Sequence, residues 1–229
     1  MSELIHIKRP DGKDCPAYLA TPAAASKGAM VVIQEWWGLN DQIKGTADRI
    51  AKEGYTAVVP DLFRGKVTKD KDEANHLMSG LDFMDAASQD VRGCVQHLKA
   101  RGAAKVAVGG FCMGGALTLL AAVKTPEMDA GVCFYGMPPL QAINASAIQA
   151  ALQLHFANDD DWCTPDSVNQ LEKHLKEGNV DFELYRYDAK HAFMNEARPE
   201  VYEADCAKLA WTRALAFLDR HISGWQIAG

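Results

Sequence analysis

The chain has 229 residues, of which 48% are hydrophobic and 24% charged, and its formal net charge is −6. This length and apolar content are typical of a globular protein with one large core, so we expect a single domain over residues 1–229. The acidic balance argues against a basic surface that binds phosphate backbones, and we expect no nucleic-acid partner.

The cysteines are spread along the chain and form no C-x-x-C pair, which argues against a zinc knuckle or a dithiol redox site. Residues 1–11 contain no apolar segment of the kind found in secretory signals. We therefore expect reduced thiols and a cytoplasmic location. The six cysteines are Cys15, Cys94, Cys112, Cys133, Cys163 and Cys206.

The first two apolar segments, residues 4–8 and 15–20, flank Pro10-Asp11-Gly12 and predict a β-hairpin at the edge of a sheet. Short apolar strands then alternate with helical segments, which predicts an α/β fold whose mostly parallel central sheet has helices on both faces. The predicted strands are residues 30–34, 56–59, 106–109, 130–135, 152–156 and 182–187, and the helical segments are residues 41–54, 70–101, 164–178 and 200–221.

Residues 106–123 carry no charge and lie between Lys105 and Lys124, which is the minimal length of a membrane span. The segment nevertheless begins with Val106 and Val108, continues through a glycine turn and ends in an Ala/Leu-rich stretch. This pattern favours a buried strand followed by a buried helix, and we expect no membrane partner.

The strand ending near Gly109 leads into the sequence Gly110-Phe111-Cys112-Met113-Gly114. A G-x-C-x-G segment between a strand and a helix matches the nucleophile elbow of hydrolases, with cysteine in place of serine. A sulfur at a helix N-terminus is favoured as thiolate, and the free N–H groups there can bind an oxyanion. The alternative is that Cys112 is a small buried apolar residue in a glycine-rich turn.

A nucleophilic thiol needs a base, and His191 is the histidine that lies in a loop between a predicted strand and the last helix. An acid is expected after the preceding strand, where Asp159, Asp160 and Asp161 follow each other. Spacing from His155 favours Asp160, whereas spacing back from Pro165 favours Asp161, and the run could also be a solvated turn. Nucleophile, acid, histidine is the chain order of α/β-hydrolases.

Over nearly its whole length the chain resembles the dienelactone hydrolase family, whose members are carboxymethylenebutenolidases. The Cys112 elbow together with the segment that begins at Gln34 is the specific part of this resemblance. The matching segments are Gln34-Glu35-Trp36-Trp37-Gly38, Pro60-Asp61-Leu62, Gly110-Phe111-Cys112-Met113-Gly114-Gly115, Asp160-Asp161-Trp162 and His191-Ala192-Phe193.

The resemblance implies an α/β-hydrolase fold and a triad of Cys112, an aspartate and His191. It also implies that Glu35 lies beside the resting thiol and influences when the thiol ionises, although an ordinary loop glutamate is the alternative. The oxyanion hole of the family corresponds here to the backbone N–H groups of Met113 and Trp36.

The sequence departs from the family after the histidine. Relatives that act on dienelactone hold the substrate carboxylate with a serine and an arginine, and those places carry Ala192 and Asn195 here. Arg198 or Arg64 could supply a substitute cation. Trp37, Tyr135 and Phe193 are candidate substrate-binding residues because they fall near strand ends, with core packing as the alternative for each. Asn195 is a further candidate because it takes the place of the family's arginine.

From these observations we expect a hydrolase that opens small lactones or esters through an acyl-enzyme on Cys112, without a metal or organic cofactor. A thioesterase or general carboxylesterase is a close alternative, since fold and triad do not determine the acyl group. A protein of the same fold that senses oxidation through Cys112 without hydrolysis is a second alternative. The sequence pattern gives little information about the oligomeric state, and we slightly favour a monomer.

Overall fold

The computed structural model describes residues 1–224 and contains one eight-stranded sheet in the order β1-β2-β4-β3-β5-β6-β7-β8. Strands β1, β2 and β4 pair antiparallel, and β3 to β8 run parallel to one another. The predicted hairpin, parallel sheet and α/β-hydrolase class are confirmed. The strands are β1 (Ser2–Lys8), β2 (Asp14–Ala20), β3 (Gly28–Ile33), β4 (Tyr55–Pro60), β5 (Val106–Phe111), β6 (Ala130–Phe134), β7 (Ala151–Asp159) and β8 (Phe182–Lys190).

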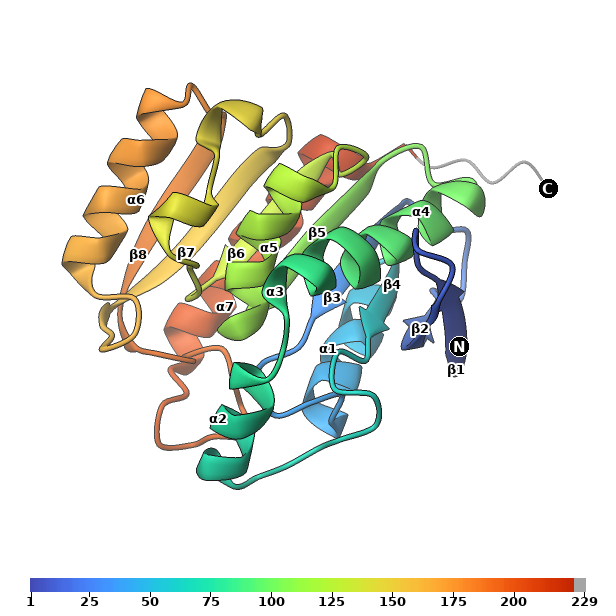
Figure 1. Cartoon of the computed structure of the whole chain (residues 1–229), viewed down its shortest axis with the longest axis horizontal. Coiled ribbons are helices and arrows are strands. Elements are labelled where there is room, and N and C mark those ends of the chain that lie inside the picture. The colour runs from blue at the N-terminus through green and yellow to red at the C-terminus, as the bar shows by residue number, and fades with distance from the viewer. Residues whose placement is uncertain (225–229) are drawn as a thin grey trace.

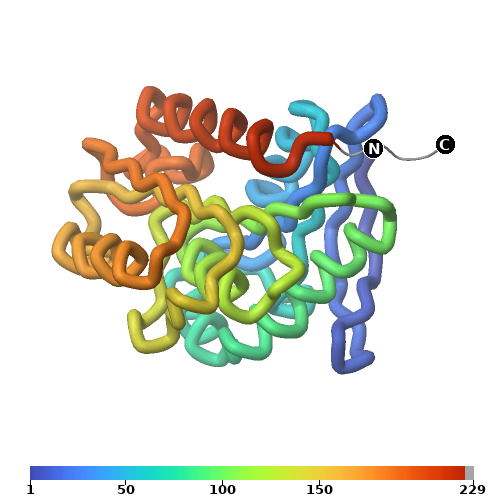
Figure 2. The backbone as a smooth tube through the Cα atoms, turned by 90° about the horizontal axis from the view of Figure 1, so that it is seen from above, coloured from blue at the N-terminus to red at the C-terminus, as the bar shows by residue number. Residues whose placement is uncertain are grey.

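Helices cover both faces of the sheet (Figure 1), and Figure 2 shows α7 on one side with α5 and α6 on the other. Helices α1 and α7 pack on one face, and α4, α5 and α6 pack on the opposite face. The helices are α1 (Asp41–Lys52), α2 (Lys71–Ser79), α3 (Phe83–Asp85), α4 (Arg92–Ala100), α5 (Met113–Lys124), α6 (Pro165–Glu177) and α7 (Ala204–Ile222).

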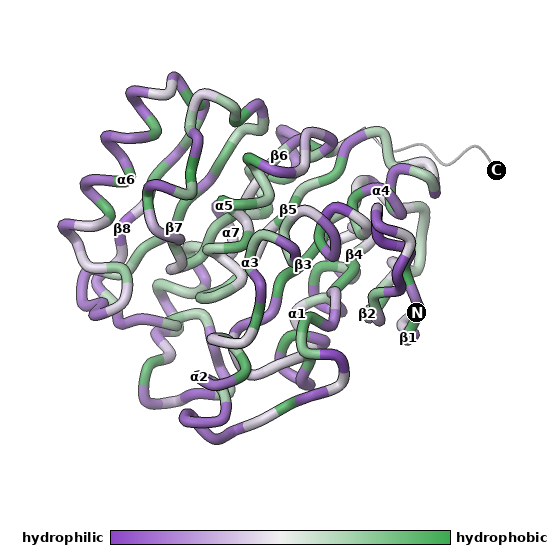
Figure 3. Tube along the Cα trace, viewed as in Figure 1, coloured by the Kyte–Doolittle hydropathy of each residue, from purple (hydrophilic) through white to green (hydrophobic). Residues whose placement is uncertain are grey.

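Alternate residues of the central strands face opposite helical layers, because side chains along a strand point to the two faces in turn. Val31 and Ile33 of β3 belong to the core under α4, α5 and α6, whereas Met30 and Val32 belong to the core under α1 and α7. All six residues of β3 are buried. Figure 3 shows hydrophobic central strands and a mostly hydrophilic outer helix α6.

The helical segment expected over residues 70–101 is divided. Helix α2 ends at Ser79 with Gly80 as its C-cap. The Asp82 side chain caps the next turn by accepting hydrogen bonds from the N–H groups of Met84 and Asp85. A π-helical turn, η1 (Ala86–Val91), connects α3 to α4. The break places α2 across the edge of the sheet where the parallel strands end (Figure 1).

The uncharged segment of residues 106–123 forms β5 and most of α5, and ten of the twelve α5 residues are buried within the protein. Within the described residues no helix combines the length and apolar character needed to cross a bilayer. Since β3, β5, β7 and β8 are parallel, their carboxyl ends meet at one edge, and Glu35, Cys112, Asp160 and His191 follow those ends.

Candidate active site

Cys112 lies at the sharp turn between β5 and α5, with φ 54° and ψ −116°. A positive φ is unfavourable for a residue with a Cβ atom and is found where surrounding contacts enforce it. Here the Cys112 N–H donates to the Phe134 carbonyl at 3.0 Å, and the Cys112 carbonyl accepts from Gly115 at 2.9 Å and Ala116 at 3.1 Å. These bonds hold the backbone in the strained conformation that turns the thiol outward at the strand end.

Two glycines allow neighbouring segments to close around this turn. A Cβ atom on Gly136 would overlap the Cys112 carbonyl oxygen, and one on Gly114 would overlap the carbonyl oxygens of Ile33 and Gln34. Larger residues would therefore push β3 and β6 away from the start of α5. The tight packing brings the residues after β3 next to the nucleophile.

The structure brings Cys112, His191 and Asp160 together in a hydrogen-bonded chain. His191 Nε2 lies 3.2 Å from Cys112 Sγ, and His191 Nδ1 lies 2.7 Å from Asp160 Oδ2. The other Asp160 oxygen accepts from the N–H groups of Trp162 at 2.8 Å and Cys163 at 2.9 Å, which holds the carboxylate in place. Asp161 lines the cavity instead, so Asp160, the aspartate expected as the acid, is the one in contact with His191.

The contacts between Cys112, His191 and Asp160 shift the pKa values of His191 and Asp160. Burial by itself lowers the pKa of His191, but the hydrogen bonds with Asp160 and Cys112 outweigh burial and raise that pKa to about 10. Burial raises the pKa of Asp160, whereas the bond with His191 and the two backbone N–H donors lower it, with a net lowering. Both shifts favour an imidazolium paired with a carboxylate.

Glu35 follows β3 and is buried, with three donors on its carboxylate. Trp37 Nε1 donates at 3.1 Å, the Tyr135 hydroxyl at 3.2 Å and the Asn195 amide at 2.7 Å. Burial raises the pKa of Glu35 above its usual range, and the hydrogen bonds from Asn195 and Tyr135 offset this only in part. Glu35 also lines the cavity that contains Cys112.

Three residues expected to bind substrate do not line the cavity. Trp37 and Asn195 are buried and use their side chains to hold Glu35, and Phe193 is fully buried against Tyr135 and Tyr187. For the two aromatic residues, a position near a strand end does not reveal which way the side chain points. Of the four candidates, Tyr135 lines the cavity.

Trp36 and Met113, whose backbone N–H groups correspond to the oxyanion hole of the family, both line the cavity that contains Cys112. Gly114 packs on the carbonyls of Ile33 and Gln34, which brings the loop after β3 against the start of α5. Neither N–H group donates a hydrogen bond to another residue of the described chain. Two unpaired donors beside a nucleophile can stabilise a developing oxyanion.

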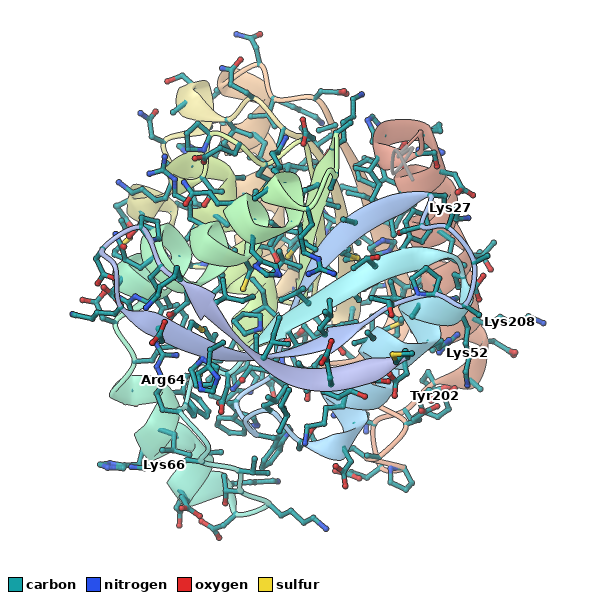
Figure 4. All side chains as sticks on the ribbon, turned by 90° about the vertical axis from the view of Figure 1, so that its right-hand side faces the viewer. Lys27, Lys52, Arg64, Lys66, Tyr202 and Lys208 are labelled. Carbon is teal, nitrogen blue, oxygen red and sulfur yellow. The ribbon has the colours of Figure 1, made fainter. Side chains whose placement is uncertain are left out.

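The cavity has a volume of about 770 Å³ and collects residues from most of the loops at this edge of the sheet. Arg198 lines it, whereas Arg64 does not. Arg64 forms an ion pair of 2.7 Å with Asp90 and lies beside the β1–β2 hairpin (Figure 4). Among the described residues, no group of three or more His, Cys, Asp or Glu side chains could hold a metal ion.

Sequence reasoning missed one wall of the cavity, formed by Lys71, Met78, Phe83 and Met84 of helices α2 and α3. Apolar residues on short helices ordinarily pack in the core, so nothing in the local pattern marks them as lining a site. It also missed Lys190 and Trp162, which flank His191 and Asp161 along the chain and line the same cavity.

Comparison with known proteins identifies related chains. The family model for the dienelactone hydrolase family matches residues 15–222. Protein usf of Aquifex pyrophilus is 34% identical over 97% of this chain and 100% of its own length, and a candidate carboxymethylenebutenolidase of Aquifex aeolicus is 33% identical with the same coverage. The crystal structure of a candidate dienelactone hydrolase from Klebsiella pneumoniae superposes with a TM-score of 0.86 and 26% identity, covering 96% of this chain and 98% of that one.

Proposed function

The chain belongs to the dienelactone hydrolase family of carboxylic ester hydrolases, and we propose that it opens small lactones or esters with Cys112 as the nucleophile. The single observation that supports this most directly is the chain of contacts from Cys112 Sγ through His191 to Asp160, at 3.2 and 2.7 Å. The reacting sulfur lines an open cavity large enough for a small molecule.

In the proposed first step the Cys112 sulfur attacks the carbonyl carbon, and the carbonyl oxygen becomes an oxyanion that accepts from the Trp36 and Met113 N–H groups. The C–O bond then breaks, and the leaving alkoxide takes a proton from His191 Nε2. The product of this step is an alcohol, or the free hydroxyl end of an opened lactone, and a thioester on Cys112.

In the proposed second step water attacks the thioester carbonyl while His191 accepts the water proton. A new C–O bond forms as the thioester C–S bond breaks, which releases the carboxylic acid and leaves Cys112 as a thiolate beside the charged imidazole. Asp160 orients the ring and stabilises its positive charge in both steps. The same imidazole thus acts as the acid in the first step and as the base in the second.

The surroundings suggest roles for two further residues. Glu35 lies in the cavity wall with a raised pKa, so a change in its protonation alters the charge near the thiol. Arg198 is the arginine that lines the cavity, and we assign to it the attraction of an anionic group on a substrate. The family name makes lactones the first compounds to test.

The test is hydrolysis of an enol lactone and of 4-nitrophenyl acetate by the wild type, Cys112→Ala and Cys112→Ser, with Cys206→Ala as the matched control. Cys206 lies on α7 and does not line the cavity. We expect Cys112→Ala to lower kcat by roughly 10³-fold or more, as for other nucleophile deletions. Mass spectrometry of the rapidly quenched wild type should find the acyl group on the peptide that contains Cys112.

Turnover by Cys112→Ala at the wild-type rate would contradict the assignment of the nucleophile. No turnover of any ester or lactone by the wild type, together with reversible oxidation of Cys112 by mild peroxide, would instead favour the redox-sensing alternative.

A further inference from the structure

We propose that the side of the cavity lined by α2, α3 and α5 is an apolar acyl subsite, and that the enzyme prefers esters of unbranched medium-length carboxylic acids. This inference rests on the proposed function and specifies its substrate class. It comes from the placement of apolar side chains relative to Cys112 and His191.

The floor of the subsite is one face of α5. Met113, Ala116 and Leu120 all line the cavity, and their spacing of three and four residues places them on the same side of the helix. Met113 directly follows Cys112, so this apolar face begins at the nucleophile and leads away from it along the helix axis. A chain attached to the sulfur can therefore lie along the face.

The facing wall is formed by the end of α2 and the start of α3. Met78, Phe83 and Met84 line the cavity here, and α3 packs against α5. Methionine side chains are flexible and polarisable, so they adapt to apolar ligands of different shape. The charged lining residue contributed by these three helices is Lys71, at the first position of α2.

The reaction geometry directs the acyl chain toward this side. In the tetrahedral intermediate the oxyanion faces the Trp36 and Met113 N–H groups, and the leaving oxygen faces His191 Nε2 to take its proton. The remaining substituent on the carbonyl carbon is the acyl chain, and it points away from His191. On the His191 side the lining includes charged residues, among them Asp161 and Lys190.

The volume of the cavity and the exposure of its apolar lining are suited to an extended apolar ligand. Cavities of about 300–1,000 Å³ bury ligands of drug size, and this cavity measures about 770 Å³. One large apolar side chain on the wall of the subsite, Met84, is 41% exposed. An apolar chain in the cavity would remove part of this surface from water, which favours binding.

The test measures kcat/KM for two series of substrates. One keeps the 4-nitrophenyl leaving group and lengthens the acyl chain from acetyl through butanoyl and hexanoyl to octanoyl. The other keeps the acetyl group and lengthens the alcohol from ethyl to octyl. We expect kcat/KM to rise about two- to fourfold for each methylene added to the acyl chain until the subsite is full, and to change little with the alcohol.

Two variants should lower the ratio of hexanoyl to acetyl kcat/KM, on the order of tenfold. Ala116→Leu fills the floor, and Met84→Glu places a charge on the wall while keeping a residue that favours a helix. The matched control is Leu209→Glu, since Leu209 is 46% exposed on α7 and does not line the cavity. Thermal unfolding of each variant shows whether it folds.

A flat acyl series with measurable acetyl turnover would overturn the subsite while leaving the proposed function intact. A slope in the alcohol series alone would also overturn it, because the apolar side would then hold the leaving group. Absence of turnover in both series would refute the proposed function itself and the subsite with it.

Discussion

The side-chain amide of Asn195 donates a 2.7 Å hydrogen bond to the buried carboxylate of Glu35, and the two residues are 160 positions apart in the chain. The resemblance places Asn195 where relatives use an arginine to hold substrate. In this protein the side chain is buried and points to Glu35 instead of into the cavity. The residue therefore acts on the site through Glu35, as a positioning residue.

Asn195→Asp should destabilise the protein in a pH-dependent way. The substitution replaces a donor with a second carboxylate beside Glu35, and two like charges in a buried site oppose each other. We expect a loss of about 1–3 kcal/mol in the free energy of unfolding at pH 8, and a smaller loss at pH 5, where one carboxyl can hold a proton. Urea unfolding at both pH values measures this, with Asn75→Asp on the exposed surface of α2 as the control. Equal losses at both pH values would argue against the charge explanation.

Asp160→Asn should reduce catalysis far more than Asp161→Asn. Asp160 accepts from His191 Nδ1, so an amide at this place disturbs the tautomer and removes the charge that stabilises the imidazolium. The same change in a serine protease lowers kcat by about 10⁴-fold, and we expect a loss of at least 10²-fold here. Steady-state kinetics with 4-nitrophenyl acetate distinguishes the two variants. A larger loss in Asp161→Asn would reverse the assignment.

The stability of the wild type should fall as the pH rises above neutrality, and His191 should account for part of the fall. The pKa of His191 is raised to about 10 in the folded protein, whereas an unfolded histidine has a pKa of about 6.5. The folded state therefore binds the extra proton between these values, and its stabilising effect is full below pH 6.5 and lost as the pH rises to about 10. Urea unfolding of the wild type and His191→Gln between pH 6 and pH 10 tests this. Parallel pH profiles would show that His191 does not contribute.

Gly136→Ala should destabilise the nucleophile turn. The added methyl group would overlap the Cys112 carbonyl oxygen, which is backbone and cannot rotate away. Overpacking of this kind costs about 1–3 kcal/mol, and the displaced turn should also slow alkylation of Cys112 by iodoacetamide. Gly45→Ala is the matched control, because a Cβ atom on Gly45 meets nothing within 4 Å in helix α1. That change should stabilise the protein by about 0.5–1 kcal/mol. A stable Gly136→Ala variant with unchanged alkylation would contradict the packing account.

Local patterns in the sequence were enough to predict the sheet, the hairpin and most helix positions, because strand alternation, caps and glycine turns depend on residues that are close along the chain. The G-x-C-x-G turn and the loop position of His191 were visible for the same reason. The break between α2 and α3 was less visible, since helical composition continues on both sides of Gly80 and Asp82.

Tertiary packing decided what the patterns left open. Asp160 instead of Asp161 faces His191 because the backbone after β7 turns its side chain inward, where the N–H groups of Trp162 and Cys163 hold it. The burial of Trp37, Phe193 and Asn195 and the apolar wall from α2 and α3 depend on segments distant in sequence that meet at the edge of the sheet. Sequence determined which chemical groups reach that edge, whereas the direction of each side chain and the shape of the cavity follow from long-range packing, which no local pattern encodes.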